Sequence, residues 1–293
     1  MATITASNPP TSTSEKTRVW RIVPAKAEID PIRYARANRQ RRIWLGVLTP
    51  VVLLAFWELA SRMEWINAQY FPGPSRIIVA AGDMIASGQW IADVGATLRT
   101  IALAGVIGFV LGLFLGVIMG AFATIRHLFE PVLSAFYTVP KIALLPLMLL
   151  VFGIGETPGN LLVGVDVFFV AWISTLEAVV KVPGGYREAS ESFGVRGIRE
   201  FGHVTLPAIL PAVFVALRIA VGQAVVITIM VEYLMGNKGI GYRIWHAWSL
   251  FDANTMYVGI VTVAVLGYLL QLLVKFVGAR AVPWAATSSG GDK

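Results

Sequence analysis

The 293-residue sequence contains no cysteine and only three histidines, at positions 127, 203 and 246. Without cysteine, disulfide bridges, thiolate metal sites and thiol nucleophiles are excluded. No histidine lies inside a long apolar run, so few side chains remain there for nucleophilic or metal chemistry. A G-x-x-x-x-G-K-[ST] phosphate-binding loop is also missing, which excludes ATP hydrolysis by that mechanism. These absences argue against an enzyme.

Charged residues are few as well. They make up 14% of the chain, against about 25% in ordinary soluble domains. Apolar residues make up 56%, and the mean hydropathy is +0.70. The net charge of +7 does not indicate nucleic acid, because the basic residues gather at the ends of apolar runs. The composition predicts an all-α polytopic membrane protein.

Six apolar segments are long enough to cross a bilayer, which takes about 20 helical residues. They are 43–61, 100–125, 131–155, 157–180, 206–235 and 255–274. Pro140 and Pro146 interrupt the third segment, and glycines at every fourth position from Gly108 to Gly120 give the second a face for close helix packing. Between the first two segments, Ser75 is predicted to cap a short helix along the membrane surface.

The distribution of Lys and Arg predicts the topology. With a cytoplasmic N-terminus, the inner segments 1–42, 126–130, 181–203 and 275–293 hold seventeen Lys and Arg, and the outer segments 62–99 and 236–254 hold five. This excess follows the positive-inside rule, so both termini and residues 181–203 are predicted to be cytoplasmic. The arginines just before residue 43 also predict contact with anionic membrane lipid.

A polar, basic segment stands between the fourth and fifth apolar segments. Glu188, Ala189 and Ser190 are followed after three residues by Gly194, and nine residues later comes Val204-Thr205-Leu206-Pro207. This spacing resembles the E-A-A-x3-G-x9-I-x-L-P signature of ABC-importer permeases. Ser190 replaces the second alanine and Val204 the isoleucine, and both keep similar size.

Further motifs resemble the branch of that family that handles nitrate, sulfonates and taurine. They are Pro72-Gly73-Pro74-Ser75, Val139 to Pro146, Phe152 to Glu156, Leu217-Arg218 with Gly222, Val231-Glu232, and Gly239 to Tyr242. The resemblance covers about residues 70 to 280. It implies the MetI-like fold of type I ABC importers, with six transmembrane helices.

The resemblance also implies the partners. The chain would be a permease subunit of the bacterial inner membrane without a cofactor of its own, and ATP and Mg²⁺ would bind two separate ABC ATPase subunits. A periplasmic or lipid-anchored binding protein would deliver a small anion such as a sulfonate, taurine, nitrate or bicarbonate. A second permease subunit, expected to be a copy of this chain, would complete the pathway. No nucleic-acid partner is expected.

The family's coupling role, the contact with the ATPase, carries over to Glu188, Ala189, Ser190, Gly194, Leu206 and Pro207. Residues 186–193 are expected to form a short helix ending in a turn at Gly194, with Phe193 as an apolar anchor. Pro207 would start the next helix, where its missing N–H costs little. Local structure alone is the alternative role of these residues.

Six charged residues lie within the apolar segments, and four of them are candidates for the translocation pathway: Lys141, Asp166, Arg218 and Glu232. A charge at the bilayer centre costs about 2.5–3.5 kcal/mol on insertion scales, so each needs a reason. One hypothesis is that they line the translocation pathway, where Lys141 and Arg218 would suit an anion. The other is that the cations pair with Asp166, Glu177 or Glu232 and hold the helices together.

The expected domains are a disordered, basic N-terminus (1–42), the first span with its external connection (43–98), the permease core (99–281) with the coupling loop 182–205, and a C-terminal tail (282–293). A different class of protein would be an ion-coupled secondary transporter or channel that uses the intramembrane charges. Survival of transport after ATP depletion would distinguish it from an ATP-driven importer.

Overall fold

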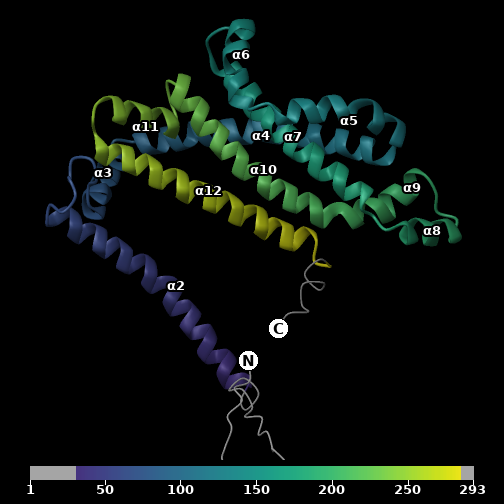
Figure 1. The fold of residues 1–293 in the computed structure, drawn as a ribbon, viewed down its shortest axis with the longest axis horizontal. Coiled ribbons are helices and arrows are strands. Elements are labelled where there is room, and N and C mark those ends of the chain that lie inside the picture. The colour runs from purple at the N-terminus through teal and green to yellow at the C-terminus, as the bar shows by residue number, and fades with distance from the viewer. Residues whose placement is uncertain (1–30, 285–293) are drawn as a thin grey trace, which may run out of the picture. The chain divides into compact units, whose positions relative to one another are not determined.

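The computed structural model describes residues 31–284, with the side chains of that range except those of 31–40, 42, 43, 47 and 187. Regular structure in this part is helical (Figure 1). The contacts divide the chain into two units, Met1–Pro74 and Ser75–Lys293. Residues 1–30, which are predicted to be disordered, and residues 285–293 of the tail lie outside the described residues.

The elements follow one another in this order: α2 (Pro31–Arg62), α3 (Pro74–Ala86), α4 (Gln89–Ala121), α5 (Ala123–Thr138), the 3₁₀ turn η1 (Lys141–Leu144), α6 (Leu145–Phe152), α7 (Glu156–Val180), α8 (Gly184–Ser192), α9 (Ile198–Glu200), the π-helical turn η2 (Phe201–Thr205), α10 (Leu206–Met235), α11 (Ile240–Ser249) and α12 (Ala253–Ala281). Among the described residues, five helices are long and apolar enough to cross a membrane, or six if a bent pair forms one span. The predicted all-α, six-span architecture is confirmed.

The first unit is built on α2. This helix begins at Pro31, within the segment expected to be irregular through residue 42, and includes the predicted span 43–61. Near its end Arg62 pairs with Glu58, with 2.5 Å between Nε and Oε1. The Ser61 hydroxyl donates to the carbonyl of Phe71 at 3.2 Å and so ties the following turn to the helix.

The second unit has α7 at its centre, between α4 and α10. The predicted glycine face of α4 packs on α7: a Cβ on Gly116 would lie 2.7 Å from the carbonyl oxygen of Trp172, and Gly108 and Gly112 approach the α7 backbone even more closely. Gly108 faces Gly164 and Gly116 faces Trp172, so the two helices run parallel. The predicted packing role of these glycines is confirmed.

Helix α10 runs antiparallel to α7 and closes the core from the other side. Gly159 of α7 leaves room for Val231, whose Cγ1 would lie 2.5 Å from a Cβ at that position. Leu162, Val163 and Val167 are almost completely buried between these helices. Inside a bilayer the hydrophobic effect does not drive helices together, so close packing at small residues such as these holds them in contact.

The third predicted span is sharply bent. Helix α5 and the η1–α6 segment meet at an angle of 90° across the break at Val139 and Pro140. Proline accounts for a break, since it cannot donate the backbone hydrogen bond that continues a helix. Helix α6 then projects from the rest of the second unit, and the side chains of Leu150 and Ile154 are 83% and 96% exposed (Figure 1).

Candidate functional site

The predicted coupling segment folds as a short helix followed by a tight turn. Helix α8 ends where the Phe193 N–H donates to the carbonyls of Ala189 and Ser190, each at 3.2 Å. Gly194 follows with φ +75°, and the Val195 N–H returns to the Ser190 carbonyl at 2.9 Å. Because this left-handed conformation suits glycine best, the predicted turn at Gly194 is confirmed.

This segment presents large apolar side chains to its surroundings. Phe193 is 86% exposed and Ile198 is 88% exposed. Glu188 and Ala189 lie on the exposed surface of α8 as well, whereas Ser190 is buried. Two uncovered apolar anchors within a polar, charged segment are typical of a surface that another protein covers.

After the irregular residues 193–197, the segment continues into the core as helix. Residues Ile198–Met235 form one helical stretch in which the π-helical turn η2 joins α9 to α10. The Thr205 hydroxyl donates to Glu200 at 2.8 Å across this turn. Leu206 begins α10 and Pro207 lies in its first turn. A displacement of α9 would therefore reach α10 through continuous helix.

Two of the intramembrane charges, Lys141 and Asp166, influence each other electrostatically near the bend of the third span. The ammonium of Lys141 donates to the carbonyl of Tyr137 and lies 4.5 Å and 5.1 Å from the ring centres of Tyr137 and Phe169. Asp166 of α7 is near enough to interact with Lys141 electrostatically, although no ion pair within 4 Å joins these two. The Asp166 Oδ2 is buried without a hydrogen-bond partner among the described residues.

Arg218, in contrast, has no acidic partner in the described part of the chain. Its side chain is exposed on α10, and no hydrogen bond or ion pair joins it to another residue of the described chain. The three acids that could have paired with it interact elsewhere: Glu177 with Lys181 at 2.7 Å, Asp166 with Lys141, and Glu232 as described next. The structure does not bring Arg218 together with the other predicted pathway residues.

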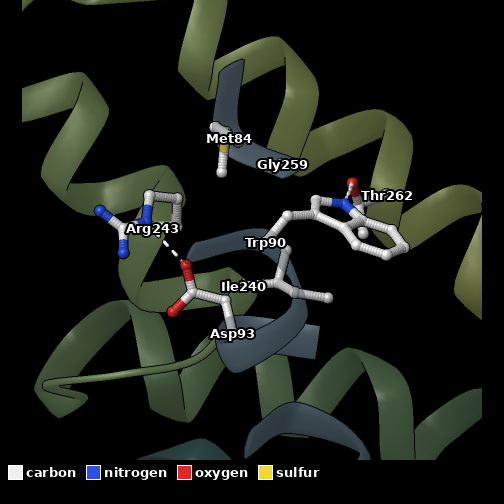
Figure 2. A pocket seen from close by; sticks show the side chains of 7 residues that line it. All are labelled: Met84, Trp90, Asp93, Ile240, Arg243, Gly259 and Thr262. Atoms are coloured by element: carbon white, nitrogen blue, oxygen red, sulfur yellow. Dashed lines mark hydrogen bonds and ion pairs between the residues drawn. The ribbon is translucent and has the colours of Figure 1, made fainter. Parts of the chain in front are cut away.

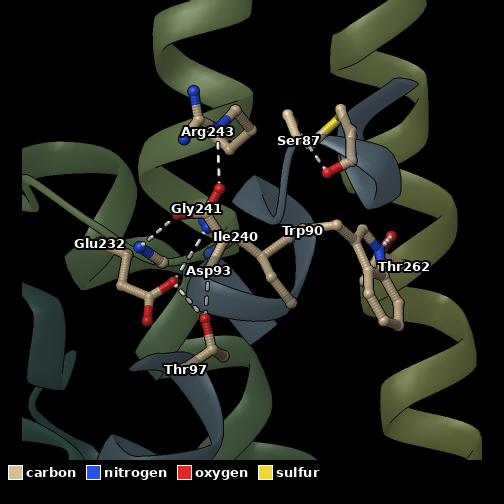
Figure 3. A network of polar contacts seen from close by, with 11 residues as sticks. Ser87, Trp90, Asp93, Thr97, Glu232, Ile240, Gly241, Arg243 and Thr262 are labelled. Carbon is tan, nitrogen blue, oxygen red and sulfur yellow. Dashed lines mark hydrogen bonds and ion pairs between the residues drawn. The ribbon is translucent and has the colours of Figure 1, made fainter. Parts of the chain in front are cut away.

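Glu232 belongs to a buried network at the end of the bundle that holds α11 (Figure 3). Its Oε2 accepts hydrogen bonds from the Thr97 hydroxyl of α4 and from the Gly241 N–H of α11, both at 2.9 Å. Thr97 in turn accepts from the Ile240 N–H at 3.0 Å. The Thr97 hydroxyl oxygen and Glu232 Oε2 thus accept hydrogen bonds from the first two N–H groups of α11. These N–H groups have no partner within the helix, because no helical turn precedes them.

Asp93 of α4 completes this network. Its two carboxylate oxygens accept from the Gly239 N–H at 3.2 Å and from Nε of Arg243 at 2.7 Å. No motif in the sequence pointed to Asp93 or Thr97, because their partners follow 135 to 150 residues later. The network fixes the start of α11 against α4 and α10.

A small pocket borders the same network (Figure 2). It is lined by Met84, Trp90, Asp93, Ile240, Arg243, Gly259 and Thr262. The Trp90 indole donates to the Thr262 hydroxyl at 3.0 Å and links α4 to α12. The space holds about one water molecule, too little for a transported solute. In the described part of the chain, no group of three or more His, Asp or Glu side chains could hold a metal ion.

Comparison with known proteins identifies the architecture. Residues 108–282 match the family described as the binding-protein-dependent transport system inner membrane component. The chain belongs to this family. It is therefore a multi-pass ABC permease subunit and not itself an enzyme.

Named relatives of the permease cover most of its length. A protein of Escherichia coli strain K12 described as an aliphatic sulfonates transport permease, SsuC, is 31% identical over 240 residues, which cover 80% of this chain and 89% of the relative. The taurine permease TauC of the same strain is 27% identical, covering 83% and 90%. The nitrate import permease NrtB of Leptolyngbya laminosa is 26% identical, covering 89% and 96%.

A solved structure supports the fold of the permease. A chain of the MetNI methionine ABC transporter in an inward-facing conformation is similar with a TM-score of 0.57 at 25% sequence identity. The match covers 64% of this chain and 92% of that chain. The predicted MetI-like fold is therefore confirmed.

Proposed function

We propose that this permease imports a small oxyanion of the sulfonate, taurine or nitrate type and that ATP hydrolysis on separate subunits drives the import. The substrate class is supported by the relatives, whose names refer to aliphatic sulfonates, taurine and nitrate. An external binding protein would deliver the solute. ATP and Mg²⁺ would bind two partner ATPases, and a second copy of this chain would complete the membrane part.

The observation that carries the proposal is the exposed coupling segment. Phe193 and Ile198 are uncovered on a segment that also holds Glu188 and Gly194. From Ile198 onward this segment is continuous helix with α10, which would transmit the movement of an ATPase into the membrane. Its basic flanks follow the positive-inside pattern and support a cytoplasmic location, where ATP is present.

For the pathway we propose Lys141, Asp166 and Arg218 as polar groups of the water-exposed route. A charged side chain inside a bilayer faces the bundle interior or water rather than lipid. Lys141 lies at the bend of the third span and Arg218 on an exposed side of α10, so neither side chain is enclosed in the apolar core. Glu232 already binds Thr97 and Gly241, which favours a structural role for this carboxylate over a place in the pathway.

The test is affinity purification of the tagged permease from its own host in mild detergent. Wild type is expected to retain an ABC ATPase. The double variant Phe193→Ser/Ile198→Ser is expected to lose at least nine-tenths of it, since removal of central apolar anchors typically costs binding 2 kcal/mol or more. Phe251→Ser is the matched control, because Phe251 is 76% exposed but lies at the α11 end of the bundle.

Retention of the ATPase by the double variant would place the coupling contact elsewhere. Recovery of no ATPase with wild type, together with uptake that persists after ATP depletion while a proton gradient remains, would favour an ion-coupled transporter instead. Equal loss in the Phe251→Ser control would show that apolar surface residues act only through the general stability of the permease.

A further inference from the structure

Helices α10 and α12 meet along one face of each (Figure 1). A Cβ on Gly278 would contact Phe214 at 3.2 Å, a Cβ on Gly222 would lie 3.4 Å from the Gln271 amide nitrogen, and Gly267 lies opposite Val225. Since the numbers rise on one helix as they fall on the other, the helices run antiparallel. These contacts fix the register between them.

The register places two cations opposite each other. On α10, Arg218 lies four residues after Phe214 and four before Gly222, on the face that meets α12. On α12, Lys275 lies four residues after Gln271 and three before Gly278, on the face that meets α10. Arg218 and Lys275 therefore occupy the same level of the contact, one helical turn from the Gln271 amide.

No carboxylate of the described residues pairs with these cations. Helix α12 contains no Asp or Glu, and the only acid of α10 is Glu232, fourteen residues or about 21 Å from Arg218. Arg218 and Lys275 are both exposed, and neither has a hydrogen bond or ion pair to another described residue. Two unpaired cations at the same level of an apolar helix pair are costly in a membrane, and a bound anion would lower that cost.

We propose that Arg218, Lys275 and Gln271 form an oxyanion-binding site between α10 and α12. A guanidinium offers a planar fork of N–H donors that matches sulfonate, nitrate or phosphate oxygens. The ammonium adds a second charge and the amide a further donor. The oxyanion comes either from the transported solute, in which case the inference rests on the proposed function, or from the headgroup of an anionic lipid.

The test measures both sources with the permease complex purified from its own host. Complexes in zwitterionic phosphatidylcholine nanodiscs are titrated with ³⁵S-labelled ethanesulfonate. Complexes in nanodiscs with phosphatidylglycerol are analysed by native mass spectrometry, which counts retained lipid. The variants are Arg218→Gln, Lys275→Gln and the control Arg280→Gln. Arg280 is a cation of the same helix end, but its guanidinium stacks on Phe276 at 3.5 Å.

With the site occupied by solute, Arg218→Gln weakens ethanesulfonate binding at least about tenfold and Lys275→Gln at least about threefold, while Arg280→Gln changes it less than about twofold. With the site occupied by lipid, the same two variants retain about one phosphatidylglycerol fewer per chain than Arg280→Gln does. If both probes bind Arg218→Gln and Lys275→Gln as they bind Arg280→Gln, the inference is wrong. Recovery of the ATPase in each sample separates this failure from a failure of the proposed function. Should Arg218→Gln not assemble, Lys275→Gln alone decides.

Discussion

The hydroxyl of Thr97 supports two helix ends at once. It accepts a hydrogen bond from the Ile240 N–H and donates one to Glu232, and the side chain is fully buried. Thr97→Val keeps the shape but leaves a buried N–H unsatisfied and removes one donor from the carboxylate. At about 1–3 kcal/mol for each unsatisfied buried group, we expect about 2–4 kcal/mol of lost stability.

The measurement is thermal unfolding of the purified permease in detergent, monitored by its intrinsic fluorescence. Thr97→Ser is the matched control, because it keeps the hydroxyl and loses only one methyl group, worth about 1 kcal/mol. If Thr97→Val unfolds at the same temperature as Thr97→Ser, the network does not stabilise α11.

The ion pair between Lys238 and Glu156, in contrast, is expected to add little to the stability of the permease. Its Nζ and Oε1 are 2.5 Å apart, but the side chains are 50% and 59% exposed. Exposed pairs contribute about 0–1 kcal/mol because water and salt screen them. Lys238→Ala is therefore expected to shift the midpoint of the same unfolding measurement only slightly. A loss comparable to that of Thr97→Val would mean that this pair is shielded in the assembled transporter.

At the scale of elements, the contact between α4 and α7 depends on glycine at particular turns. A Cβ on Gly116 would lie 2.7 Å from the Trp172 carbonyl oxygen and 2.8 Å from Thr175 Cβ, so Gly116→Ala forces the helices apart. Overpacking of this kind costs about 1–3 kcal/mol. Gly105→Ala on the same helix meets only Ala224 Cβ, at 3.9 Å, and is expected to be neutral or stabilising.

The yield of monodisperse permease in size-exclusion chromatography compares the two alanine variants. Gly116→Ala is expected to aggregate or to elute with a lower yield, and Gly105→Ala to behave as wild type. Equal yields would show that α4 and α7 can separate without cost, contrary to the close backbone contact.

The elements differ in how far the sequence predicted them. The bounds of α10 agree with the predicted segment 206–235, because Pro207 and the flanking polar residues mark both ends. Helix α4 begins eleven residues before the predicted start at 100, since Asp93 inside it is neutralised by Arg243 from a distant helix. The 90° bend before α6 was not foreseeable either: prolines predict a break, but its angle depends on packing.

In the candidate site, too, the sequence predicted local features but not contacts between distant segments. The turn at Gly194 and the helix start next to Pro207 were predicted, because both are local features of the sequence. The partners of Glu232 and the absence of a partner for Arg218 depend on which helices become neighbours. The register of α10 on α12 follows from glycine contacts that no short sequence pattern encodes.

At the scale of the whole molecule, the proposed function requires the coupling segment and α11 to lie on opposite sides of the membrane. Helix α10 joins them, and the Lys and Arg distribution predicts that the coupling segment is cytoplasmic. Because the chain contains no cysteine, a single introduced cysteine can report its own location. Ser192→Cys at the end of α8 and Ser249→Cys at the end of α11 are both exposed.

A membrane-impermeant maleimide is expected to label Ser249→Cys in intact spheroplasts and Ser192→Cys only in inverted vesicles, with the unmodified chain as a blank. Labelling of both positions from one side would mean that α10 does not cross the membrane. Reversed labelling would place the coupling segment outside the cell, away from ATP, and would exclude an ATPase contact at Phe193 and Ile198. The topology is thus the simplest condition that the proposed function has to meet, because the coupling contact can exist only if the positive residues mark the inner side.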